Sequence, residues 1–149
     1  MSDTAAITVD EEERDALLGT GGTGVMSFPG PAEDSPHAVP ISYGYDGADS
    51  TFYFRLAAGQ DSDKGDLTDR PVTFVTHDRQ DGTWWSVVAK GRLEGTTEAS
   101  VATESLAGLQ NVQIPLVDIF GRPVSDIPFE FYRLVPEELT ARKESSTAP

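Results

Sequence analysis

The sequence contains no cysteine. Disulfide bonds, thiolate metal ligation and a cysteine nucleophile are therefore excluded, and any redox chemistry has to come from a bound cofactor. The sequence also lacks a run of about 18 apolar residues that could span a membrane. Residues 1–8 have neither the basic start nor the apolar stretch of a signal peptide. We therefore expect a soluble, cytoplasmic protein.

Positive charge is scarce, and lysine occurs only as Lys64, Lys90 and Lys143. The chain has 25 acidic residues against 11 basic ones, a formal net charge of -14. Such a charge repels nucleic acids and anionic membrane surfaces, so neither is an expected partner. Because the acid is spread along the chain, the composition resembles that of halophilic proteins. We expect folding and subunit association to weaken in dilute buffer, where salt does not screen the repulsion.

His37 and His77 are the only histidines, and no carboxylates are spaced around them as metal ligands. No metal site is predicted. No serine lies in a GxSxG motif, so serine catalysis is not predicted either. Residues 19–24 contain a formal GxGxxG match, but here a helix precedes the glycines and a strand follows, the reverse of a dinucleotide-binding fold. We interpret them as a flexible turn between helix and strand.

The 149 residues fit one domain, which we place at residues 1–143, followed by a disordered tail at 144–149. Asp46-Gly47 and Asp81-Gly82 are hairpin signals that indicate a mostly antiparallel sheet. The fold class is therefore mainly β (α+β), with a strand count that suits a barrel. Six β-prone runs are predicted as strands, at residues 23–28, 38–45, 51–56, 72–77, 84–93 and 129–135.

Two short helices flank these strands. Residues 8–11 form a capping-box pattern that begins with Thr8, followed by Leu17 and Leu18, with Gly19 placed to end the helix. Residues 97–109 are rich in Ala, Glu and Leu, and predict a second helix capped by Thr96 or Thr97.

Alternation within the strands predicts which side chains are buried. In the fifth run, Ser86, Lys90 and Arg92 fall on one face, which is either exposed to water or in contact with a partner. In the second run both faces are nearly apolar, which favours a strand sandwiched by a subunit or a ligand. The buried face of the fifth run is expected to carry Trp85, Val87, Ala89 and Leu93.

The most informative segment begins at Arg55 and continues through a polar loop that contains Ser62 and Lys64. A guanidinium, a hydroxyl and an ammonium within ten residues form a plausible cradle for a phosphate dianion. The alternative is a solvated loop in which Lys64 pairs with a neighbouring aspartate. Composition alone leaves both interpretations open.

The order of elements resembles the FMN-binding split-barrel group related to pyridoxamine 5'-phosphate oxidase. The resemblance runs from about residue 10 to 94: an N-terminal helix, a glycine-led strand, HAVPI at 37–41, an Asp-Gly hairpin, and FYF at 52–54. It continues with the SDK loop at 62–64, DRPV at 69–72, and WSVVAKGR at 85–92. No single piece is diagnostic, but their order and spacing together are fairly specific.

This resemblance implies a homodimer with FMN at its interface and the ring lying along residues 39–43. It also implies a small-molecule substrate and hydride transfer at the flavin, with no side chain identified as catalytic. Trp85 and Ser86 match a strand close to the flavin, although Trp85 is equally well interpreted as a core aromatic. The implied cofactor contacts are Val39, Pro40, Ile41, Ser42, Arg55, Ser62, Lys64, Trp85 and Ser86.

The chain departs from the family in two respects. Asp61 and Asp63 make its phosphate loop more acidic, and the basic C-terminal substrate motif of the true oxidases has no counterpart. It therefore looks like the small, divergent members grouped with flavin reductases and nitroimidazole-resistance proteins, and we expect an FMN-dependent oxidoreductase. The alternative functions are a non-enzymatic flavin binder, a split barrel that binds a deazaflavin or haem, and a structural dimer with an empty pocket.

Two features near the C-terminus leave alternatives open. The apolar segment 110–128 covers either the partner's flavin pocket or the chain's own barrel. Arg133 and Arg142 reach the flavin phosphate or the substrate, or pair with surface carboxylates, and the abundance of carboxylates favours pairing.

Overall fold

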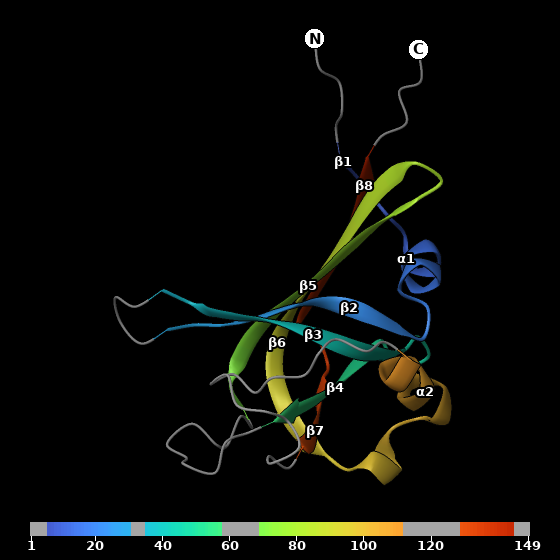
Figure 1. Ribbon diagram of the computed structural model, residues 1–149. Helices are drawn as coiled ribbons and strands as arrows, with labels where there is room; N and C mark the ends of the chain where they lie inside the picture. The colour runs from blue at the N-terminus through green and yellow to red at the C-terminus, as the bar shows by residue number, and fades with distance from the viewer. Residues whose placement is uncertain (1–5, 31–34, 58–68, 112–128, 145–149) are drawn as a thin grey trace, which may run out of the picture.

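The computed structural model describes residues 6–30, 35–57, 69–111 and 129–144 (Figure 1). Ser62, Lys64 and the predicted tail at 145–149 lie outside these ranges, as does most of the apolar segment 110–128. The elements in chain order are β1 (Ala6–Thr8), α1 (Glu11–Leu18), β2 (Gly21–Phe28), β3 (His37–Asp46), β4 (Thr51–Ala57), β5 (Pro71–Gln80), β6 (Thr83–Thr96), α2 (Thr103–Asn111), β7 (Phe129–Leu134) and β8 (Glu138–Glu144).

Six strands close into an antiparallel barrel in the order β6-β5-β2-β3-β4-β7, with β7 returning to β6. This confirms the predicted six-stranded barrel with short flanking helices, and all six predicted strands are present. Asp81 and Gly82 have φ of 53° and 80°, as the two-residue hairpin turn between β5 and β6 requires.

Two strands were not predicted. β8 pairs with the first half of β6, from Trp85 to Lys90, while β7 pairs with its end, from Leu93 to Thr96. β1 then pairs with β8 and lies at the edge of the sheet. The sheet therefore extends past the barrel along β6, as Figure 1 shows. Glu144, the first residue of the predicted tail, is the last residue of β8.

The barrel interior is filled by alternate side chains from every strand, as the predicted faces of β6 require. Trp85, Val87, Ala89 and Leu93 all belong to the core cluster. Its centre is aromatic: the ring centroid of Phe74 lies 5.0 Å from that of Phe54 and 5.3 Å from that of Tyr43. Such edge-on ring pairs add to the free energy gained from burial.

The first helix begins at Asp10, whose carboxylate accepts a hydrogen bond from the Glu13 N–H at 2.8 Å. The predicted cap at Thr8 is therefore wrong by two residues, because Thr8 belongs to β1 and pairs with Arg142. Gly19 ends the helix with φ of 60°, as predicted. No helix within the described ranges is long and apolar enough to cross a membrane.

The second predicted helix is divided in two. A short 3-10 turn at Glu98–Ser100 precedes α2, and buried Val101 lies between them. α2 packs on the outside of β3, where the Ser105 hydroxyl donates to the Tyr45 carbonyl at 2.9 Å. A helix of the chain itself, and not a subunit or a ligand, therefore covers β3 near Tyr45.

The turn between α1 and β2 is only Gly19 and Thr20, whereas Gly21, Gly22 and Gly24 belong to β2, which corrects the interpretation of residues 19–24 as one flexible turn. α2 approaches them so closely that a Cβ at Gly108 would collide with the Thr20 carbonyl, and a Cβ at Gly21 would collide with Gly108. The glycines thus allow close helix-to-strand packing.

Candidate cofactor site

The outer face of the sheet formed by β3, β2, β5, β6 and β8 carries three parallel rows of side chains. We call them the cation row, the apolar row and the arginine row. Their order follows from the pairing register, because residues opposite one another in neighbouring strands share a face. The cation row contains Ala38, Ser27, Thr73, Lys90 and Glu138, and the apolar row contains Pro40, Val25, Val75, Val88 and Thr140. The arginine row contains Ser42 and Thr23 on one side and His77, Ser86 and Arg142 on the other, and the two parts align if the register of Val25 with Val75 is continued by two residues.

A cavity of about 620 Å³ lies at the cation row, lined by Ser27, Thr73, Lys90 and Arg92 among others. Neither cation forms an ion pair with a carboxylate of the described residues. Glu137 and Glu138 also line the cavity, which therefore presents charges of both signs beside two hydroxyls. Its size falls within the range of small-molecule and cofactor pockets.

This cavity lies where the chain returns from the predicted phosphate loop to the sheet. The Arg92 guanidinium donates to the Asp69 carbonyl at 2.9 Å, and the Asp69 N–H donates to the Leu93 carbonyl at 2.6 Å. These bonds fix the start of β5 against β6. The alternation of side chains predicted that Lys90 and Arg92 lie on the outer face. It did not predict that they lie near the end of the phosphate loop, because that proximity depends on the strand register.

The four predicted contacts on β3 are divided between its two faces. Val39 and Ile41 point into the barrel, where Ile41 is only 4% exposed. Pro40 is exposed on the outer face, and Ser42 is buried there. Of these four residues, only Pro40 and Ser42 therefore present side chains to the outer face. Val39 and Ile41 pack in the core on the opposite face of β3.

One backbone edge of β3 is paired over only part of its length within the described ranges. The Tyr45 N–H donates to the Thr20 carbonyl at 2.9 Å, on the side of β2, so the backbone groups of Pro40 and Ser42 point to the opposite edge. Pairing with β4 at that edge runs only from Gly44 to Asp46. Pro40, which has no N–H to donate, is tolerated inside β3 for this reason.

Arg55 lies on β4, where it is half-buried and stands opposite Phe131 of β7. It alternates with Phe54 and Leu56, which belong to the core, so its side chain points out of the barrel. Tyr53 shares this outer face, and burial raises the pKa of its hydroxyl. Because Ser62 and Lys64 are outside the described ranges, the three-residue phosphate cradle stays a prediction.

Trp85 and Ser86 also point to opposite faces. Trp85 is 9% exposed and belongs to the core, in line with the alternative reading of this residue. Ser86 lies on the outer face between His77 and Arg142. Ser42 and Ser86 are separated by β2 and β5, which is roughly 14 Å at the usual spacing between strands. One chain therefore does not bring these predicted contacts together around one ring.

The two C-terminal arginines differ. Arg133 pairs with Glu94 at 2.7 Å on the surface, as expected from the abundance of carboxylates. Arg142 forms no ion pair with a described residue and lines a second cavity with His77 and Ser86. Within the described ranges, no group of three or more carboxylates and histidines gathers as metal ligands.

The comparisons with known proteins agree with this architecture. The sequence profile of the pyridoxamine 5'-phosphate oxidase family matches residues 10–143, and the chain belongs to this family. No curated protein sequence matches the chain.

Three solved structures illustrate the shared fold. An FAD-binding protein from Mesorhizobium loti has a TM-score of 0.60 at 18% identity, covering 96% of this chain and 99% of its own. The FAD binding protein of Mycobacterium smegmatis has a TM-score of 0.58 at 20% identity, covering 92% and 97%. An FAD and heme binding protein from the same organism has a TM-score of 0.58 at 13% identity, covering 95% and 74%.

Proposed function

We propose that this protein is a flavoprotein that binds FMN at a homodimer interface on the outer sheet face and uses it as an oxidoreductase. The observation that supports the proposal most directly is the arrangement of this face. A cavity with two cations and two hydroxyls lies alongside the apolar row, and this row ends at the partly paired edge of β3. A flavin mononucleotide offers a phosphate, an apolar ring and a polar ring edge, which match these three features in kind.

Each part of the chain has a distinct task in this proposal. Arg55, Ser62 and Lys64 hold the phosphate, and Lys90 and Arg92 add positive charge at the cavity of the cation row. Backbone groups of Pro40 and Ser42 meet the polar edge of the ring, and Ser86 supplies a hydroxyl. Bound FMN supplies the hydride chemistry, so the protein needs no side-chain acid or base and contributes position and electrostatics.

The apolar row is the proposed subunit contact. Within this row Val25 is 42% exposed and is flanked by Pro40 and Val75. A two-fold axis along this row would lay the cation row of one subunit over the arginine row of the other. That assembly would bring Ser86 of each subunit close to the phosphate end of the other site, which the single chain does not do.

Removal of the phosphate ligands tests the cofactor assignment. Arg55→Ala and Lys64→Ala are each expected to weaken FMN binding at least tenfold, because each removes a charge-assisted hydrogen bond. Riboflavin, which lacks the phosphate, should bind the variants and the parent equally. Flavin fluorescence titration in molar salt measures both affinities.

Arg133→Ala is the matched control, since Arg133 already pairs with Glu94, and it should bind FMN like the parent. Unchanged FMN affinity in both phosphate-site variants would show that the phosphate is held elsewhere.

A charge in the apolar row tests the dimer. Val25→Glu should convert a dimer to a monomer, because two carboxylates would be buried across the two-fold axis. Val135→Glu is the matched control, since Val135 is 47% exposed and lies outside the row. Light scattering after size exclusion measures the mass of each variant, and a parent protein that is itself monomeric would refute the interface.

FAD is the second candidate cofactor. The similar structures from Mesorhizobium loti and Mycobacterium smegmatis are described as FAD-binding, and the cavity at the cation row could take an additional phosphate. The mass of the released cofactor distinguishes FAD from FMN. An intense Soret absorption band would instead indicate haem, which one of the similar proteins binds.

A further inference from the structure

A second cavity, of about 290 Å³, lies at the end of the arginine row, and we call it the Trp84 cavity. It is bounded by the hairpin of β5 and β6 on one side and by β8 and β1 on the other. Its lining includes Ala6, His77, Trp84, Ser86, Arg142 and Glu144.

Trp84 forms an exposed aromatic surface in this cavity. Its side chain is 47% exposed, although an indole buries a large apolar area when it is covered. The guanidinium carbon of Arg79 lies over the indole at 5.4 Å from the ring centroid. The imidazole of His77 lies 5.9 Å from the indole at an interplanar angle of 47°. These neighbours restrict the indole, so little conformational entropy is lost when a second ring stacks on it.

Two arginines near the indole, Arg79 and Arg142, form no ion pair among the described residues, and of these only Arg142 lines the cavity. Lys143 pairs with Glu13 at 2.6 Å, and the Glu144 carboxylate accepts the Trp84 backbone N–H at 2.7 Å. Arg142 has no such ion pair within the described part of the chain. A guanidinium presents two parallel N–H groups, which match the two oxygens of one carboxylate.

We propose that the Trp84 cavity binds a flat aromatic ring that carries a single carboxylate. The ring stacks on Trp84, and the carboxylate accepts hydrogen bonds from Arg142 and from the Ser86 hydroxyl. A phosphate dianion fits less well, because Glu144 repels its second charge and, among the described residues, Arg79 lies over the indole and does not line the cavity. The identification of this ring as the substrate class rests on the proposed function, since Ser86 also belongs to the cofactor site, whereas the binding itself does not.

Three probes with the same naphthalene ring test the head group: 2-naphthoate, 2-naphthalenemethanol and 2-naphthyl phosphate. We expect 2-naphthoate to bind about tenfold more tightly than the neutral alcohol and more tightly than the phosphate. Calorimetric titration of the full chain in molar salt measures the three affinities, with and without added FMN. Equal affinity for acid and alcohol, tighter binding of the phosphate, or no binding of the acid would each overturn the proposal.

Two variants locate the site. Arg142→Gln should weaken 2-naphthoate about tenfold and leave the alcohol unchanged, because only the charged contact is lost. Trp84→Ala should weaken both ligands by a similar factor, while Trp84→Phe retains most of the affinity. Arg133→Gln is the control, since Arg133 is a similarly exposed arginine outside the cavity. If Arg142→Gln binds 2-naphthoate like the parent, the cavity is not the site.

The two proposals fail in different ways. Binding of 2-naphthoate by a chain that binds no flavin would refute the proposed function and leave the ring site intact. Binding of FMN without any effect of Arg142 or Trp84 on 2-naphthoate would refute the ring site alone.

Discussion

Tyr43 shows how one residue of the barrel makes stability depend on pH. Its side chain is 2% exposed, and its hydroxyl donates to the Leu18 carbonyl at 3.1 Å. Burial raises the pKa of Tyr43 to about 12, because the phenolate would lose its hydration. The folded pKa lies above that of the unfolded chain. The stabilisation is therefore fully present below about pH 10 and is lost as the pH rises through about 12.

We predict that the free energy of unfolding falls by about 2 to 3 kcal/mol between pH 10 and 12 from this group. Tyr43→Phe should be about 1 kcal/mol less stable near neutral pH, because its hydrogen bond is lost, but should have a flatter alkaline profile. Urea unfolding at a series of pH values measures the free energy of unfolding of the parent and of the variant. Tyr45 and Tyr53 also have raised pKa values, so some slope should remain. Parallel profiles for parent and variant would contradict the assignment to Tyr43.

For individual residues, the sequence predicted burial better than it predicted contacts. The alternation of Trp85 to Leu93 was sufficient to assign the faces of β6, because side chains in a strand alternate whatever the strand pairs with. The neighbours of Lys90 and Arg92 were not predictable, because they depend on which residues of β5 and β8 lie opposite. The cap of α1 was misplaced because Thr8 and Asp10 are both good capping residues, and only the pairing of Thr8 in β1 decides between them.

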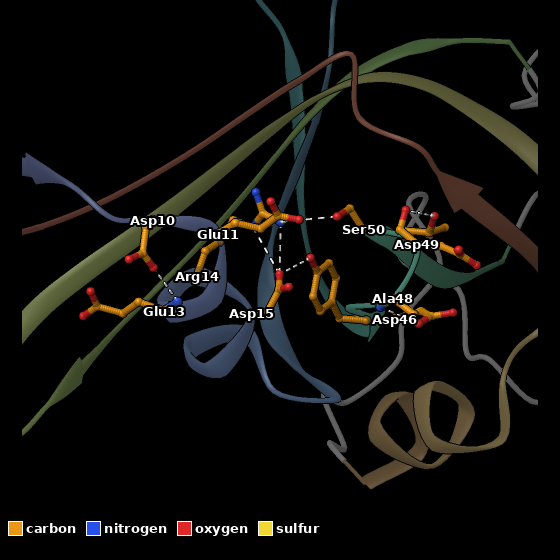
Figure 2. A network of polar contacts seen from close by, with 11 residues as sticks. Asp10, Glu11, Glu13, Arg14, Asp15, Asp46, Ala48, Asp49 and Ser50 are labelled. Atoms are coloured by element: carbon orange, nitrogen blue, oxygen red, sulfur yellow. Dashed lines mark hydrogen bonds and ion pairs between the residues drawn. The ribbon is translucent and has the colours of Figure 1, made fainter.

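The element α1 is held to the barrel by a compact polar network (Figure 2). The Tyr45 hydroxyl donates to the Asp15 carboxylate at 2.6 Å, and Arg14 donates to both Asp15 and the Ser50 hydroxyl. Burial by itself lowers the pKa of Arg14, but the hydrogen bond to Asp15 and the nearby charges more than reverse this, and the net pKa is raised. The Asp15 carboxylate therefore accepts hydrogen bonds from Arg14 of α1 and from Tyr45 of β3.

Asp15→Ala should destabilise the protein by about 2 kcal/mol, because it removes the acceptor of the Tyr45 hydroxyl and one of the acceptors of Arg14. Glu12→Ala is the control, since Glu12 is exposed on the same helix and should change stability by less than about 0.5 kcal/mol. The urea unfolding midpoint measures both. Combining Asp15→Ala with Tyr45→Phe should cost less than the sum of the two changes, and strict additivity would contradict the network.

β8 shows which elements sequence does not reveal. Its seven residues, ELTARKE, include only Leu139 and Ala141 as apolar side chains, and the propensity signal is weak. The strand forms because β6 offers it a partner edge, where Ala141 pairs with Val87 and Leu139 with Ala89. α2 was predicted to start too early because the composition of residues 97–109 does not show that Val101 is buried ahead of the helix.

The net charge of -14 acts on the whole molecule. Self-repulsion destabilises the compact state and falls as salt shortens the screening length from about 30 Å at 10 mM to about 3 Å at 1 M. We predict a melting temperature several degrees higher in molar sodium chloride than in dilute buffer. Scanning calorimetry measures it, with sorbitol of equal osmolality as the uncharged control. An equal rise in sorbitol would attribute the effect to solvent exclusion and not to charge.

The fold was accessible from sequence because the order of helix, strands and turns constrains the topology strongly. The three rows of the outer face were not accessible, because they arise from the register of five strands together. The predicted cofactor contacts are consequently divided: Pro40, Ser42 and Ser86 lie on the outer face, and Val39, Ile41 and Trp85 point into the core.

The sharing of one edge of β6 between β7 and β8 has a consequence for biosynthesis. Both partners are encoded after residue 128, so a ribosome that has released β6 and α2 exposes an incomplete barrel with an unpaired strand edge. Closure must wait until residues 129–144 have been translated. We expect nascent chains of this protein to depend on chaperones that shield β edges until β7 and β8 emerge.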